Sequence, residues 1–124
     1  MIVGSTKEDL TLEKRVSLTP ETAKNIIGLG LKVFIEKDYA SHLGIQDKDY
    51  TNIGVEIKSS SNEVLSSCNM LIKVNCPSEN EIKNLREKTI LIGMLDLSKN
   101  KRKVNEIIKK KGKHLFIRIV TSYY

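Results

Sequence analysis

The sequence predicts an α/β domain with a mainly parallel sheet and helices on both faces of that sheet. Short apolar runs alternate with amphipathic segments along the whole chain, which is the pattern of strand followed by helix. The 124 residues are enough for one ordinary domain with a core of its own. There is no internal repeat and no linker rich in proline, glycine or serine. Residues 1–124 are therefore predicted to form a single domain.

The best-marked element is a helix over residues 19–30, with the sequence TPETAKNIIGLG. Thr19 is a natural N-cap, because its hydroxyl can accept a free backbone N–H. Pro20 suits the first helical position, where its missing N–H would have no helical partner. Gly28 and Gly30 can end the helix in a left-handed conformation.

The other elements follow from shorter runs, and the polar residues 5–17 are predicted to form a loop. Apolar runs predict strands over residues 1–4, 31–36, 55–58, 70–74, 89–97 and 114–120. Amphipathic spacing predicts helices over residues 47–54, 59–67, 78–87 and 98–112. Asp47 is the predicted cap of the first of these helices. Ser78 and Glu81 form a capping-box pattern at the start of the third.

Composition and charge restrict the classes of function. The net charge of +6 would suit nucleic acid or a membrane surface. However, the lysines are scattered, and aromatic residues make up only 5% of the chain. Proteins that stack bases need more aromatic side chains than this, so we predict no nucleic-acid partner. The lysine-rich face from Lys99 to Lys113 is interpreted as the solvated side of an amphipathic helix.

Cysteine usage and hydropathy indicate a cytoplasmic protein. Cys68 and Cys76 form no C-x-x-C pair, and no histidine lies at metal-ligand spacing, so we predict no metal site. A reduced, intracellular chain is the simplest interpretation of these two cysteines. No signal peptide is visible, and no apolar run approaches the roughly 20 residues that span a bilayer.

Polar residues at the ends of two predicted strands mark the candidate site. Lys73 and Asn75 lie at the end of the strand over residues 70–74, and Asp96 lies near the end of the next strand. In an open α/β sheet, ligands bind outside the carboxyl ends of the strands. A lysine and an amide on one side of a strand can hold an anionic or carbonyl-bearing ligand. The alternative is structural: Lys73 extends to water, and Asn75 ties down the loop before Pro77.

Two segments resemble a known family. Residues 13–36, EKRVSLTPETAKNIIGLGLKVFIE, look like the opening of the alanine dehydrogenase and NAD(P) transhydrogenase alpha-subunit family. Residues 71–82, LIKVNCPSENEI, resemble a later segment of that family. The resemblance covers residues 2–112 or so and is most specific at Arg15-Val16, Thr19-Pro20 and Lys73 to Pro77. It implies a Rossmann-like or flavodoxin-like domain on the substrate side of the enzyme.

Two positions separate the branches of this family. By the resemblance, alanine dehydrogenases have a second lysine where this chain has Asn75, and that lysine contacts the substrate. They also have a histidine, acting as general acid/base, where this chain has Asp96. The transhydrogenase alpha subunit commonly reads K-V-N-x-P, which is close to KVNCP here. The resemblance therefore points to the transhydrogenase branch, and it gives Arg15 an anion-binding role, with a surface salt bridge as the alternative.

The family's NAD-binding domain is expected to be absent from this chain. That domain carries a glycine-rich fingerprint that places a pyrophosphate at a helix N-terminus. The 124 residues contain no G-x-G-x-x-G, and the sequence GLG at residues 28–30 is interpreted as a helix stop. We therefore expect a truncated N-terminal fragment that binds no cofactor by itself, whereas the family binds NAD through the missing domain.

Three functions stay open from the sequence. The first is the N-terminal part of a transhydrogenase alpha subunit, inactive alone, in an enzyme that couples hydride transfer between NADH and NADP to proton passage. Its partners would be the NAD-binding domain and a membrane subunit, with a homodimer in the full enzyme and a peripheral position at the inner membrane. The second is the substrate-side domain of an alanine dehydrogenase-like enzyme, with Asp96 as the base. The third is a basic interaction module without enzymatic activity, or a gene remnant.

Overall fold

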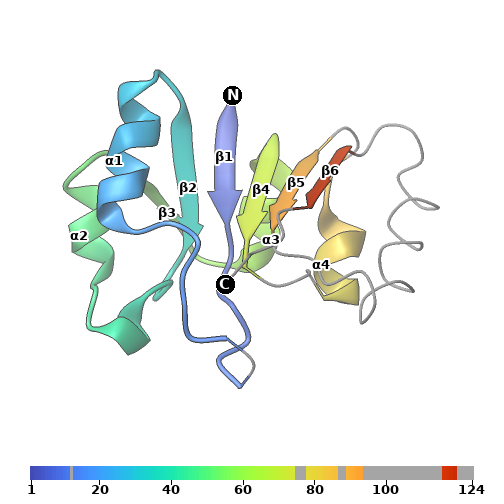
Figure 1. Ribbon diagram of the computed structural model, residues 1–124, viewed down its shortest axis with the longest axis horizontal. Helices are drawn as coiled ribbons and strands as arrows, with labels where there is room; N and C mark the ends of the chain where they lie inside the picture. The colour runs from blue at the N-terminus through green and yellow to red at the C-terminus, as the bar shows by residue number, and fades with distance from the viewer. Residues whose placement is uncertain (12, 75–77, 87–88, 94–115, 120–124) are drawn as a thin grey trace.

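The described part of the chain forms one parallel sheet. The computed structural model describes residues 1–11, 13–74, 78–86, 89–93 and 116–119. Its strands are β1 (Ile2–Ser5), β2 (Lys32–Glu36), β3 (Glu56–Lys58), β4 (Met70–Lys73), β5 (Ile90–Gly93) and β6 (Phe116–Ile119). Their order in the sheet is β3-β2-β1-β4-β5-β6, and every pair of neighbours is parallel (Figure 1). The predicted parallel α/β sheet is confirmed.

The helices fall where the amphipathic segments predicted them, although each is shorter than its prediction. They are α1 (Pro20–Gly28), α2 (Asp47–Thr51), α3 (Ser61–Ser67) and α4 (Glu79–Asn84), with a short 3-10 helix η1 (Ser41–Leu43). The helix predicted over residues 98–112 lies outside the described residues. No helix in the described ranges is long and apolar enough to cross a membrane.

The helices cover both faces of the sheet, as predicted, because side chains alternate along each strand. Figure 1 shows α3 behind the sheet, on the face opposite α1. The face toward α1 and α2 carries a cluster of buried residues: Val3, Leu18, Ala23, Val33, Ile35, Tyr39, Ala40, Tyr50 and Val55. The face toward α3 and α4 carries a second cluster: Leu65, Cys68, Leu71, Ile82, Leu85 and Leu91.

Strand β1 and helix α3 approach each other closely at Gly4. A methyl group on the Gly4 Cα would lie 2.8 Å from Cβ of Cys68 and 2.8 Å from Cγ1 of Val64. Those distances are shorter than any van der Waals contact, so only glycine fits there. Gly4 therefore serves the packing of α3 against β1.

The caps of two helices show where local prediction succeeds and where it fails. The Thr19 hydroxyl accepts the N–H of Thr22 at the start of α1, as predicted. Gly30 follows the helix with a φ of +90°, also as predicted, whereas Gly28 is the last residue of the helix and is not left-handed. The prediction that Asp47 caps α2 is wrong, because Gln46 is the N-cap. Asp47 instead accepts the backbone N–H of Asp38, the one described non-glycine residue with positive φ.

Candidate functional site

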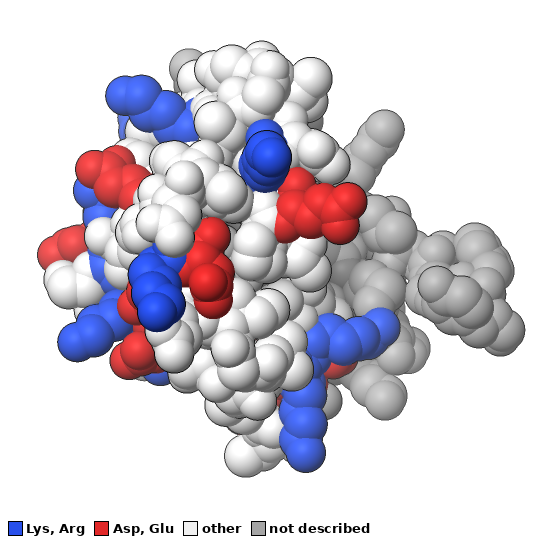
Figure 2. Space-filling model, turned by 90° about the vertical axis from the view of Figure 1, so that its left-hand side faces the viewer, with Lys and Arg blue, Asp and Glu red and all other residues white. Residues whose placement is uncertain are grey.

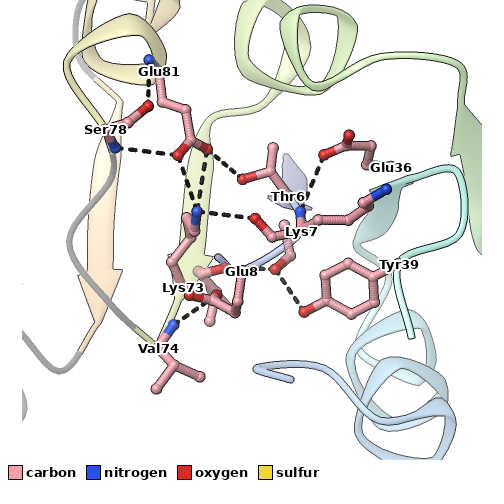
Figure 3. A network of polar contacts seen from close by, with 11 residues as sticks. Thr6, Lys7, Glu8, Glu36, Tyr39, Lys73, Val74, Ser78 and Glu81 are labelled. Carbon is pink, nitrogen blue, oxygen red and sulfur yellow. Dashed lines mark hydrogen bonds and ion pairs between the residues drawn. The ribbon is translucent and has the colours of Figure 1, made fainter. Parts of the chain in front are cut away.

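The strand order reverses between β1 and β4, and the carboxyl ends of both strands meet at this switch point. In open α/β sheets such a reversal opens a crevice where ligands bind. Here a set of polar contacts joins the ends of these strands to the neighbouring segments (Figure 3). We call it the switch-point network, and it consists of Thr6, Lys7, Glu8, Glu36, Lys73, Val74, Ser78 and Glu81.

The centre of the network is a buried ion pair between Lys73 and Glu81. Nζ of Lys73 lies 3.0 Å from Oε1 and 3.2 Å from Oε2 of Glu81, and it donates to the Lys7 carbonyl at 3.2 Å. The side chain of Lys73 is 5% exposed and that of Glu81 is 16% exposed. A lysine ammonium has three N–H donors, and three acceptors surround this one. The alternative in which Lys73 extends to water is therefore wrong.

Helix α4 holds the Glu81 carboxylate in place. The Ser78 hydroxyl accepts the N–H of Glu81, and the N–H of Ser78 donates back to Oε1 of Glu81, which is the predicted capping box. From the other side, the Thr6 hydroxyl donates to Oε2 at 2.6 Å. Glu81 therefore caps its own helix and joins that helix to the ends of β1 and β4.

The pKa of Glu81 lies below its ordinary value of 4.5. Burial alone raises this pKa, because it disfavours the charged form. The Lys73 ammonium, with hydrogen bonds from Thr6, Ser78 and Lys73, outweighs that effect and lowers the pKa. Glu81 is thus held as a carboxylate, and it neutralises Lys73.

Two further carboxylates bind the backbone on either side of this pair. Glu8, which is 6% exposed, accepts the N–H of Val74 at 3.0 Å. Glu36, at the end of β2, accepts the N–H of Lys7 at 3.1 Å. The segment after β1 is therefore joined to the ends of both neighbouring strands.

A second group of contacts is centred on the buried hydroxyl of Tyr39. This oxygen accepts the N–H groups of Ser17 at 3.1 Å and Leu18 at 3.2 Å. It lies 2.7 Å from Oγ of Ser5, which itself donates to the Ile72 carbonyl at 2.6 Å. Tyr39 therefore donates to Ser5, and its hydroxyl joins the loop before α1 to β1 and β4. Burial raises the pKa of Tyr39, so the phenol stays protonated.

The structure places only two of the four predicted site residues. Lys73 lies in the network, as described. Arg15 lies on the loop before α1 with its side chain 64% exposed, and its Nε contacts Oε1 of Glu13 at 2.8 Å. Hydrogen bonds from Arg15 lower the pKa of Glu13 to about 2. Asn75 and Asp96 lie outside the described residues.

The sequence did not predict the partners of Lys73. The capping-box pattern predicts only a capping role for Glu81, and no pattern points to Thr6 or Glu8. The capping box could have indicated Glu81 as a partner of Lys73, because it places the Glu81 side chain at the helix N-terminus that follows β4. Thr6 and Glu8 lie in a polar stretch predicted to be a loop.

A shallow polar pocket of about 330 Å³ lies beside the network. Its lining residues are Lys7, Glu36, Ser61, Asn62, Ser78, Asn80 and Glu81. Within the described ranges, no group of three histidine, cysteine or acidic side chains could hold a metal ion. The lysine-rich residues 99–113 lie outside those ranges. On the side of the molecule that Figure 2 shows, acidic and basic side chains are interspersed.

Comparison with known proteins places this geometry in a family. The family model described as "Alanine dehydrogenase/PNT, N-terminal domain" matches residues 4–122. The chain is 32% identical over 111 residues to alanine dehydrogenase of Methanococcus maripaludis and 30% identical over 111 residues to NAD(P) transhydrogenase subunit alpha of Haemophilus influenzae. Each match covers 90% of this chain but only 30% and 21% of those relatives, respectively.

A solved structure agrees with these sequence matches. An L-alanine dehydrogenase superposes with a TM-score of 0.85 at 28% identity, over 96% of this chain and 32% of that one. The Rossmann-like fold expected from the resemblance is confirmed. The chain spans about a third or less of the length of the relatives and the solved structure it matches.

Proposed function

Because the chain belongs to the alanine dehydrogenase/PNT N-terminal domain family, we propose that it is the N-terminal part of an NAD(P) transhydrogenase alpha subunit. Such an enzyme moves a hydride between NADH and NADP, coupled to proton passage. In this proposal the 124 residues scaffold an NAD-binding domain located in another polypeptide or segment, and they have no activity alone.

The observation that carries this proposal is Asn75 at the second position of the motif, next to a first position, Lys73, that is fully used inside the fold. The Lys73 ammonium is surrounded by Glu81 and the Lys7 carbonyl, so it has no donor left for a substrate. The second position of the motif is Asn75, a neutral amide, where the alanine dehydrogenase branch has a lysine by resemblance. A domain with these two residues lacks the lysine that would hold a substrate carbonyl.

The cofactor and partners follow from the same proposal. NAD would bind to a domain bearing the glycine-rich fingerprint, which the 124 residues lack. The partners would be that NAD-binding domain and a membrane subunit, with a homodimer in the complete enzyme. The domain would lie in the cytoplasm, held at the inner membrane only through those partners.

A pair of chimaeras tests the proposal. Residues 1–112 replace the corresponding segment of a transhydrogenase alpha subunit in one chimaera and of an alanine dehydrogenase in the other. We expect the first, assembled with its membrane subunits, to bind NADH and transfer hydride to an NADP analogue. We expect the second to show no L-alanine-dependent reduction of NAD.

The matched control restores the diagnostic side chains. Asn75→Lys combined with Asp96→His in the alanine dehydrogenase chimaera should raise alanine-dependent activity while leaving NADH binding unchanged. If the unaltered chimaera already oxidises alanine, the transhydrogenase assignment is wrong. Failure of the transhydrogenase chimaera to bind NADH would also overturn it.

The second candidate is the substrate-side domain of an alanine dehydrogenase-like enzyme. Two observations favour it: the 32% identity to the Methanococcus maripaludis enzyme, and Arg15, the polar residue shared by resemblance with the substrate pocket of that branch. In this case Arg15 would bind the substrate carboxylate and Asp96 would be the base. Alanine-dependent activity that is lost in Arg15→Gln would support this candidate.

A further inference from the structure

The outer edge of β3 is unpaired within the part of the chain that the structure describes. Strand β3 is last in the sheet order, with β2 on its inner side. An unpaired edge presents backbone N–H and C=O groups to any other strand. We propose that this edge pairs antiparallel with β3 of a second copy of the chain, so that a two-fold axis passes beside Ile57.

The direction of the backbone groups supports this pairing. The Lys58 carbonyl accepts the N–H of Lys37, and Lys58 is in register with Glu36, so its backbone groups point toward β2. Backbone groups alternate in direction along a strand, so those of the preceding residue, Ile57, point outward. In an antiparallel pair about a two-fold axis, Ile57 then exchanges both hydrogen bonds with Ile57 of the second copy.

The charges on the strand are self-complementary. Glu56 and Lys58 lie on the same face of the sheet, one residue to either side of Ile57. Centring the pair on Ile57 places each Glu56 opposite Lys58 of the other copy, and opposite charges on facing positions stabilise a strand pair. The Glu56 side chain is 59% exposed, that of Lys58 is 25% exposed, and their charged atoms are already 3.7 Å apart within one copy.

The neighbouring residues limit the pairing to the centre of β3. The N–H of Val55 donates to the Tyr50 carbonyl, and the N–H of Ser59 donates to the Glu63 carboxylate. Neither N–H is therefore available to extend the ladder. Figure 2 shows the side of the molecule that includes α1 and α2, and charges of both signs alternate there without one dominant sign. Because the N–H groups of Val55 and Ser59 are already bonded, the shared ladder is short, and we expect a weak, symmetric dimer.

Charge reversal on one strand tests the proposal. We would measure the association constant of the full 124-residue chain by sedimentation equilibrium from micromolar to millimolar concentration. Glu56→Lys and Lys58→Glu each place like charges opposite one another across the axis, so each variant should dimerise at least roughly tenfold more weakly. The double variant, which exchanges the two charges, should dimerise like the original chain.

An equimolar mixture of the two single variants separates pairing from misfolding. Only a mixed dimer sets lysines opposite glutamates, so the mixture should associate more tightly than either variant alone. Circular dichroism of each variant checks that its fold is retained. If the original chain stays monomeric at millimolar concentration, or if the mixture associates no better than its components, the proposed β3 pairing is wrong.

Discussion

The ammonium of Lys73 lies 3.0 Å from Oε1 of Glu81, and both side chains are removed from most of the solvent. This one ion pair joins the end of β4 to the start of α4, and through the Lys7 carbonyl it reaches the segment after β1. The pair lies next to the point where the strand order of the sheet reverses, between β1 and β4.

Glu81→Gln should destabilise the domain strongly. The substitution leaves the Lys73 ammonium buried beside a neutral amide, and loss of one partner of a buried pair costs roughly 3 kcal/mol. The free energy of unfolding in urea measures this effect. Lys83→Gln is the control, because Lys83 is exposed on the same helix, and it should change stability by less than about 0.5 kcal/mol. Equal stabilities for the two variants would contradict the structural role of the pair.

The same pair predicts how stability changes with pH. The pKa of Glu81 is lower in the folded chain than its ordinary 4.5, so the unfolded chain binds more protons in acid. The stabilisation is therefore present above pH 4.5 and is lost as the pH falls through the lowered folded pKa. Measured by urea unfolding from neutral pH to about pH 3, the free energy of unfolding should fall less steeply in Glu81→Gln than in the original chain. Parallel curves for the two proteins would refute this assignment.

Tyr39→Phe should loosen the loop before α1. The ring remains, but the N–H groups of Ser17 and Leu18 lose their acceptor, which costs roughly 2 kcal/mol. The rate of hydrogen exchange at these two amides should increase more than the rate at amides elsewhere in the chain. Tyr50→Phe is the matched control, since it removes a single hydrogen bond to the Leu18 carbonyl and should cost about 1 kcal/mol. Unchanged exchange at both amides would show that Tyr39 does not hold the loop.

Gly4→Ala should destabilise the domain by about 1 to 3 kcal/mol, because the new methyl group would meet Cys68 and Val64 at 2.8 Å. Gly28→Ala should act in the opposite direction. Gly28 is the last residue of α1, and a Cβ there would meet nothing within 4 Å. Alanine at this position should therefore raise the free energy of unfolding by about 0.5 kcal/mol. Thermal unfolding of the two variants gives the comparison, and a tolerated alanine at position 4 would rule out the close approach of α3.

Local patterns predicted the elements better than the contacts between them. Thr19, Ser78 and Gly30 were identified correctly because each acts on backbone groups within a few residues of itself. The cap of α2 was assigned one residue too late, because a glutamine is a less common cap than the aspartate that follows it. Tyr39, which joins three elements, carried no signal in its own sequence neighbourhood.

The sequence by itself determined the alternation of strands and helices, most of the helix caps and the family to which the chain belongs. Periodicity and capping depend on neighbouring residues, so they can be read along the chain. Only the tertiary structure decided that Lys73 pairs with Glu81 and not with solvent. It also brought Thr6 to Glu81 across 75 residues and Glu8 to Val74 across 66. Alternation tells which face of a strand a side chain occupies, whereas the partner on that face depends on which distant strands lie side by side.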